Sequence, residues 1–203
     1  GYPNIQLELK TKTDYVDHLL DIPDKGSAVI GFSLNPSRII ENEEGDSASL
    51  DARLEAARKV LEAGYRVAFH FDPIFYYREE RGRDECRGRT EAWEEEYGQV
   101  VSELKKFRDG KVAWISLGTF RYTAKLRQSA GERPFFFEEF VPCIDGKYRY
   151  IQKIRGEMYR KMKDHIQSTV NAPVYLCMES PAVWKKLIGT LPTREPALTR
   201  LFH

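Results

Sequence analysis

Short hydrophobic runs rich in β-branched residues alternate along the chain with longer segments of helical periodicity. The runs predict five strands, at Ile5–Lys10, Ala28–Leu34, Arg66–Asp72, Val112–Leu117 and Pro173–Met178. Between them, apolar residues recurring every three or four positions predict helices at Tyr15–Asp21, Leu50–Ala63, Ala92–Arg108 and Tyr148–Val170. The second helix has the clearest pattern, because its apolar residues share one side and Gly64 follows as a stop signal.

This alternation of strands and helices is typical of βαβ units, whose strands run parallel in one sheet. About four such units make up roughly half of a TIM-type β/α barrel, which usually needs about 250 residues. We therefore predict an α/β fold, the C-terminal portion of a partial barrel over residues 1–190, with a loosely ordered tail over 191–203. Two inserts interrupt the alternation, the Arg/Glu-rich Arg78–Glu91 and the aromatic Pro134–Tyr150.

The composition narrows the class of protein. Hydrophobic residues make up 41% and charged residues 31%, as in soluble globular domains, and the net charge of +1 means that partners must be sought in local patches. No apolar run approaches the roughly 18 residues of a membrane span, so we expect no membrane partner. Cys86, Cys143 and Cys177 are widely spaced, which favours reduced thiols in the cytoplasm and excludes a compact cysteine metal motif.

Candidate chemistry lies where the predicted strands end, because ligands of parallel barrels bind at the carboxyl ends of the strands. Those ends carry Lys12, Ser33, Asn35, Asp72 with Pro73, Gly118 with Arg121, and Glu179. A lysine ammonium and two short polar side chains can hold an amino-acid-like carboxylate and a ribose. Each residue also has a purely structural interpretation: Lys12 as a solvated lysine, Ser33 as a hydroxyl that satisfies a turn, and Asp72 as a turn former.

From Lys10 to about Leu104 the sequence resembles the spore photoproduct lyase family of radical S-adenosylmethionine enzymes. The order and spacing of the matching pieces agree as well as their identity, and beyond Leu104 the similarity is thinner, at Leu117–Arg121 and Lys147–Tyr150. The matching pieces are Thr11-Lys12, Val16–Asp21, Phe32-Ser33-Leu34-Asn35, Glu44–Gly64, Pro73-Ile74 and Trp93-Glu94-Glu95-Glu96-Tyr97.

The resemblance implies that Lys12, Ser33 and Asn35 contact S-adenosylmethionine. It further implies that the intact enzyme removes a hydrogen atom from a cross-linked pyrimidine lesion in DNA, which then splits into two bases. A [4Fe–4S] cluster is also implied, held by a CxxxCxxC motif that the chain lacks. We expect that motif, and the cysteine that returns the hydrogen atom, in a missing N-terminal half of the barrel upstream of Gly1. The chain is then a fragment with no metal site of its own.

A basic stretch from Lys147 to Lys163 is the candidate nucleic-acid surface. It has seven Lys/Arg residues against the single acid Glu157, with tyrosines interleaved. Basic side chains neutralise phosphates and aromatic rings stack on extruded bases, so with the resemblance we predict DNA as partner. The substrate contacts that we predict are Arg121, Tyr150 and Arg155. The alternative is a solvated amphipathic helix whose tyrosines pack on the barrel.

The lesion-contacting segment of the family resembles Gly-Arg-Tyr-Gly, whereas this chain has Lys153-Ile154-Arg155-Gly156, without the tyrosine. Three hypotheses therefore remain. The first is the C-terminal part of a lesion-cleaving radical enzyme, whose catalytic residues the sequence does not identify. The second is a non-catalytic nucleic-acid-binding half-barrel, and the third is a radical enzyme with a different substrate.

Overall fold

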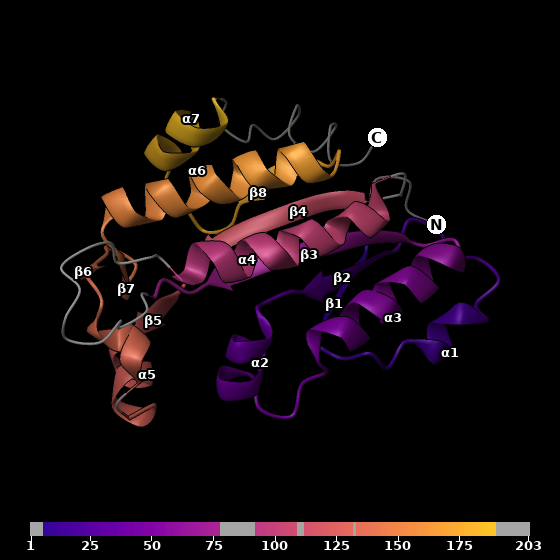
Figure 1. Cartoon of the computed structure of the whole chain (residues 1–203), viewed down its shortest axis with the longest axis horizontal. Coiled ribbons are helices and arrows are strands. Elements are labelled where there is room, and N and C mark those ends of the chain that lie inside the picture. Colours follow the sequence, from indigo (N-terminus) through magenta and orange to yellow (C-terminus); the bar gives the residue numbers. More distant parts are fainter. Residues whose placement is uncertain (1–5, 78–91, 109–111, 132, 190–203) are drawn as a thin grey trace.

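A five-stranded parallel sheet forms the centre of the molecule, in the order β1-β2-β3-β4-β8 (Figure 1). The computed structural model describes residues 6–77, 92–108, 112–131 and 133–189. The strands are β1 (Glu8–Thr11), β2 (Val29–Ser33), β3 (Arg66–Ile74), β4 (Val112–Thr119) and β8 (Val174–Leu176). All five predicted strands are therefore confirmed, with shifted ends. The predicted insert at 78–91 and the predicted tail at 191–203 lie outside the described residues.

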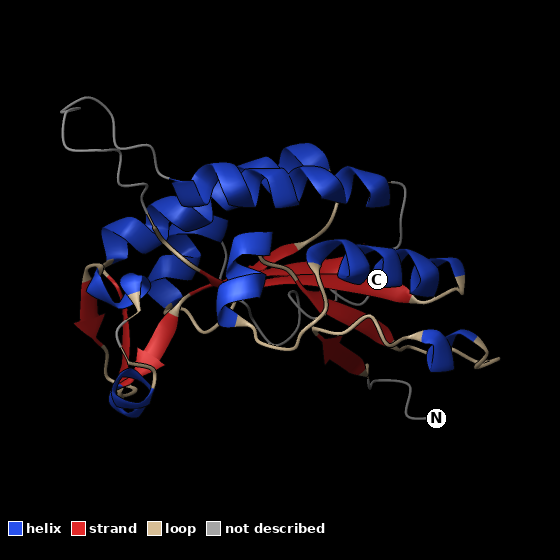
Figure 2. Ribbon diagram, turned by 60° about the horizontal axis from the view of Figure 1, so that its bottom comes forward, coloured by secondary structure: helices blue, strands red, loops and turns tan. Residues whose placement is uncertain are grey.

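The long helices pack on one face of this sheet (Figure 2). They are α3 (Leu50–Glu62), α4 (Ala92–Glu103), which continues into the 3-10 helix η1 (Leu104–Phe107), and α6 (Gln152–Thr169). The shorter helices are α1 (Asp17–Leu20), α2 (Ser37–Glu43), α5 (Ala124–Ser129) and α7 (Pro181–Ile188). Helix α3 shows why the sequence folds in this way. The Ser49 hydroxyl accepts a hydrogen bond from Ala52 N at its start, and Leu54, Ala57 and Val60 bury its apolar side.

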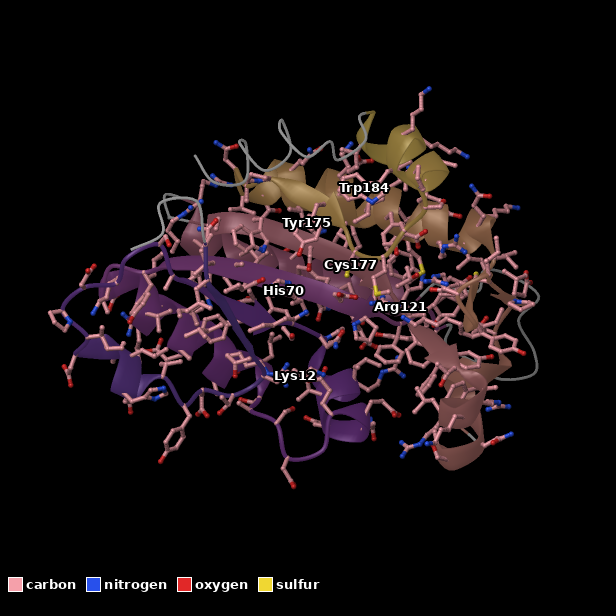
Figure 3. All side chains as sticks on the ribbon, turned by 180° about the vertical axis from the view of Figure 1, so that it is seen from behind. Lys12, His70, Arg121, Tyr175, Cys177 and Trp184 are labelled. Carbon is pink, nitrogen blue, oxygen red and sulfur yellow. The ribbon has the colours of Figure 1, made fainter. Side chains whose placement is uncertain are left out.

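The hydrophobic core lies between the sheet and these helices. The middle strands β2 and β4 are buried along their whole length, so they read as nearly continuous apolar runs rather than as alternating ones. Phe69 of β3 meets Phe107 edge to face, with ring centroids 5.0 Å apart. The opposite face of the sheet, which we call the open face, is covered by no helix among the described residues (Figure 3). The predicted α/β class with parallel strands is confirmed.

A second, antiparallel sheet follows the carboxyl end of β4. Its strands are β5 (Arg121–Thr123), β7 (Lys147–Tyr150) and β6 (Phe140–Pro142), in the order β5-β7-β6. The predicted helix Tyr148–Val170 is therefore wrong at its start, because residues 148–150 belong to β7 and α6 begins at Gln152. Aromatic packing favours the strand, since Tyr122 and Tyr148 stack with ring centroids 5.2 Å apart.

Glycines on the open face let polar side chains of alternate strands meet. A Cβ added at Gly31 on β2 would lie 2.6 Å from both Glu8 Oε1 of β1 and His70 Nε2 of β3. A Cβ added at Gly118 on β4 would lie 2.1 Å from Asp72 Oδ1 of β3. At both positions only glycine leaves room for these side chains.

Replacing Gly31 with alanine should therefore destabilise the protein by about 1–3 kcal/mol, because the new methyl group meets the buried His70 ring. Urea unfolding measures the change. The control is Gly156→Ala in α6, where an added Cβ meets nothing within 4 Å, and which should raise stability by about 0.5–1 kcal/mol. Equal stability changes in the two variants would contradict the crowding argument.

Candidate functional site

The open face carries polar side chains in rows, because alternate residues of each strand point to the same side of the sheet. In the first row, His70 of β3 lies between Ser116 of β4 and Glu8 of β1. Its Nδ1 is 2.7 Å from Ser116 Oγ and its Nε2 is 2.5 Å from Glu8 Oε1. Because a carboxylate oxygen accepts, His70 Nε2–H is the donor of the hydrogen bond to Glu8. The row holds three strands together across Gly31.

The second row lies nearer the carboxyl ends and centres on Asp72. The Asp72 carboxylate accepts a hydrogen bond from Arg121 Nη1 at 3.1 Å, and its other oxygen is 3.9 Å from Lys10 Nζ. Arg121 also approaches Met178 Sδ at 3.3 Å and Cys177 Sγ at 3.9 Å. Met178 has a φ of +54°, a left-handed conformation that is costly for a non-glycine residue. The labelled Arg121 and Cys177 lie close together in Figure 3.

The Cys177 thiol is kept protonated by this row. Burial raises its pKa to about 11, and the hydrogen bond and negative charge of Asp72 contribute in the same direction. Burial also raises the pKa of Asp72, but the hydrogen bond with Cys177 and the positive charges of Arg121 and Lys10 outweigh it and hold that pKa below its usual value. At neutral pH the row therefore pairs a neutral thiol with an ionised carboxylate.

A third group, the rim network, lies just beyond the carboxyl ends of β1 and β2. Its members are Lys12, Asn35, Glu44, Arg53 and Tyr97. The Glu44 carboxylate accepts hydrogen bonds from Lys12 Nζ at 2.9 Å, from Asn35 Nδ2 at 2.8 Å and from Arg53 Nη2 at 2.6 Å. Tyr97 donates to Asn35 Oδ1 at 2.6 Å.

The rim network is buried except for Lys12. The side chains of Arg53 and Glu44 are 0% and 3% exposed, whereas that of Lys12 is 44% exposed. Burial raises the pKa of Glu44, but the hydrogen bonds from Lys12, Asn35 and Arg53 outweigh it and hold the pKa below its usual value. Arg53 also donates to the backbone carbonyl of Ser33 at 2.8 Å, which fixes the end of β2. The structure therefore brings together the predicted residues Lys12, Ser33 and Asn35.

The other predicted site residues differ in their exposure. Arg121 lies on the open face with a side chain that is 19% exposed. Tyr150 and Arg155 are buried, and Arg155 binds Glu179 through Nε at 3.0 Å and the Tyr150 carbonyl through Nη1 at 2.5 Å. Neither side chain is presented to solvent in this conformation, so their role as substrate contacts stays a prediction.

The predicted basic stretch Lys147–Lys163 does not form one continuous charged surface. Arg149 forms a two-pronged ion pair with Asp145, at 2.7 Å for each pair of atoms, and Arg155 is buried against Glu179. Lys161 binds Glu94 and Glu157, and Lys163 donates to the Leu187 carbonyl. The tyrosines at 150 and 159 are buried, as the alternative interpretation expected. Lys153 and Arg160 remain exposed on α6.

The described residues do not fit an iron–sulfur cluster. Within them no group of three or more His, Cys, Asp or Glu side chains is arranged to hold a metal ion. Cys143 and Cys177 are both free thiols; Cys143 directly follows β6 and Cys177 directly follows β8. No helix among these same residues is both long and apolar enough to cross a membrane.

Sequence reasoning missed Glu44, Arg53 and Tyr97 as site residues. The signal in the sequence was Arg53, a charged residue on the apolar side of a helix between Leu50 and Leu54. A buried arginine requires a buried partner. Glu44 and Tyr97 carry no comparable local signal, since only the tertiary fold brings them to Asn35.

Comparison with known proteins matches one family. The family model for spore photoproduct lyase matches residues 3–173. The spore photoproduct lyase of Geobacillus sp. (strain Y412MC61) is 36% identical over 105 residues, 52% of this chain and 27% of that protein. That of Bacillus subtilis (strain 168) is 36% identical over 99 residues, 49% of this chain and 25% of that protein.

Solved structures give the same result. A spore photoproduct lyase complexed with dinucleoside spore photoproduct superposes with a TM-score of 0.66 at 27% identity, covering 85% of this chain and 51% of that one. A mutant with bound AdoMet and dinucleoside spore photoproduct gives the same TM-score, identity and coverage. The chain thus spans about half the length of the solved structures that it matches, and the predicted similarity to part of a barrel is confirmed.

Replacing Glu44 with glutamine should destabilise the fold by about 3–5 kcal/mol, because Arg53 would be left buried without its counter-charge. Since the folded-state pKa of Glu44 is lowered, its stabilisation is full above its usual value of 4.5 and is lost as the pH falls through the lower folded value. The difference between wild type and variant in urea unfolding should therefore shrink in acid. Glu55→Gln, an exposed carboxylate of α3, is the control and should change little. A pH-independent difference would contradict this assignment.

Replacing Asp72 with asparagine should lower the pKa of Cys177 from about 11, because the nearby negative charge is removed while burial remains. The rate of Cys177 alkylation by iodoacetamide near pH 9, followed by mass spectrometry, should then rise. Arg121→Gln should have the opposite effect, since its positive charge lowers the same pKa. Cys143 serves as the internal control, and an unchanged Cys177 rate in both variants would disprove the coupling.

Proposed function

The chain belongs to the spore photoproduct lyase family, and we propose that it forms the part of a radical S-adenosylmethionine enzyme that binds this cofactor at the ends of β1 and β2. The observation that carries the proposal is the rim network. A buried carboxylate, Glu44, holds the Lys12 ammonium at the carboxyl ends of parallel strands, with close to half of the lysine side chain exposed. That is the place where β/α barrels bind their ligands.

In the proposed complex Lys12 binds the carboxylate of S-adenosylmethionine, and Ser33 and Asn35 line the same position. The chemistry fits, because an anchored ammonium recognises an anion through charge-assisted hydrogen bonds. Both ends of the Asn35 amide are already bound, to Glu44 and Tyr97, so Asn35 is held in one orientation before the cofactor arrives. The solved relative with bound AdoMet supports the cofactor class.

We propose a cross-linked pyrimidine lesion of DNA as the substrate of the intact protein, whose activity would be radical lesion cleavage in DNA repair. The support is that solved relatives are complexed with dinucleoside spore photoproduct. Arg121 faces this substrate on the open face, with Lys10 beside it on Asp72. Arg155 binds both the Tyr150 carbonyl and Glu179, which follows the Arg121 contact Met178 in the chain.

S-adenosylmethionine would supply the radical chemistry of such a reaction together with a [4Fe–4S] cluster. The described residues offer no cysteine set for that cluster, so other residues must hold it and no step through it is assigned to this chain. The role proposed for the chain is to bind and orient the cofactor and the lesion. The free thiols of Cys143 and Cys177 are compatible with the reducing cytoplasm, where we place the protein.

Replacing Lys12 with alanine should weaken S-adenosylmethionine binding about 10- to 100-fold, the usual loss for a charge-assisted hydrogen bond. Equilibrium dialysis with labelled cofactor measures it. Lys59→Ala is the matched control, because the Lys59 side chain is 43% exposed and is likewise paired with a carboxylate, that of Asp17. Cofactor affinity that is the same in both variants would remove Lys12 from the site.

A further inference from the structure

A groove between α6 and α7 has positive charges that no feature described so far uses. It has a volume of about 540 Å³, and its lining includes Lys153 and Arg160 of α6 and Lys186 of α7. The single carboxylate in its lining, that of Glu157, is 3.3 Å from Lys161 Nζ. We call this feature the basic groove. Figure 1 shows α7 lying over the first half of α6.

The three cations of the basic groove are available to an external anion. Among the residues that the structure describes, Lys153, Arg160 and Lys186 have no ion-pair partner, in contrast to Lys12, Lys10 and Arg121 of the open face. All three are exposed. Holding like charges around one hollow is unfavourable unless an anion neutralises them, so the charge arrangement favours a polyanion over a neutral ligand.

The position of the basic groove connects it with the proposed lesion site. Glu179 binds Arg155 on the inner side of α6, and the preceding residues Cys177 and Met178 contact Arg121. The basic groove lies on the outer side of the same end of α6. The basic groove and Arg121 are therefore connected through Arg155, Glu179 and Met178, with α6 between them.

We propose that the basic groove binds the phosphate backbone of DNA next to the lesion. This proposal rests on the proposed function, since a lesion held at Arg121 brings flanking phosphates to this end of the molecule. It also assigns the two exposed cations of the predicted basic stretch, Lys153 and Arg160, to one site and adds Lys186 from a helix that the sequence did not predict. Contacts of this kind fix position and affinity without reading the base sequence.

The test compares two triple variants of equal charge. One neutralises the basic groove with Lys153→Gln, Arg160→Gln and Lys186→Gln. The other neutralises exposed lysines outside the groove lining, with Lys59→Gln in α3, Lys105→Gln in η1 and Lys185→Gln, the neighbour of Lys186 in α7. Fluorescence anisotropy with a short lesion-free DNA duplex gives the affinity at a series of salt concentrations, and thermal unfolding confirms that both variants fold.

The groove variant should lose at least about tenfold in DNA affinity, and its slope of log affinity against log salt should fall by about 2 to 3. In the control triple, both the DNA affinity and the salt slope should change much less. Equal losses in the two triples, or a groove variant with wild-type affinity and slope, would overturn the proposal. The same titration with an RNA duplex is the second arm, and a loss of affinity for RNA but not for DNA would also overturn it.

S-adenosylmethionine binding, measured on the same proteins, separates this inference from the function on which it rests. Normal cofactor binding with equal DNA affinity in both triples refutes the basic groove alone. A wild-type protein that binds no cofactor refutes the proposed function, while the comparison of the two triples still decides whether the groove holds DNA.

Discussion

The buried ion pair between Glu44 and Arg53 is the interaction on which the rim of the sheet depends. An isolated charge in the interior is costly, so each of these residues requires the other. Both also form further hydrogen bonds, and these hold the neighbouring groups in place. Arg53 fixes the end of β2 through the Ser33 carbonyl, and Glu44 fixes Lys12 and Asn35. One pair thus joins α2, its following loop and α3 to two strand ends. The half-exposed Lys12 is therefore held in place by an ion pair of the core.

Much of the fold could be predicted from the sequence, because periodicity reports directly on burial. Helix α3 and the strands β2 to β4 carry strong patterns, and the structure confirms them. The antiparallel sheet could not be predicted in the same way. Its strands are three or four residues long, and their stability comes from rings that meet across the sheet, such as Tyr122 and Tyr148. A pattern along the chain does not record such contacts.

The candidate site was predictable to a similar extent and for a related reason. Parallel strands bring their carboxyl ends to one edge, so Lys12, Ser33 and Asn35 could be grouped without coordinates. Glu44 and Tyr97 could not, since they depend on how α2 and α4 meet the sheet. For the basic stretch Lys147–Lys163 the prediction grouped residues that the structure separates. Adjacent charges in sequence became separate in space once β7 and α6 turned Arg149 and Arg155 toward acidic partners.

The two glycines of the open face change which residues act as neighbours. Normally a side chain in a sheet meets those of the adjacent strands, but at Gly31 the middle strand contributes only backbone. Glu8 and His70, 62 positions apart in the sequence, therefore form a direct contact across it. We therefore expect substitutions at these two positions to affect each other, and both to depend on the glycine between them. Such a triplet would leave a signature of coupled substitutions that skips one strand, visible wherever related sequences are compared.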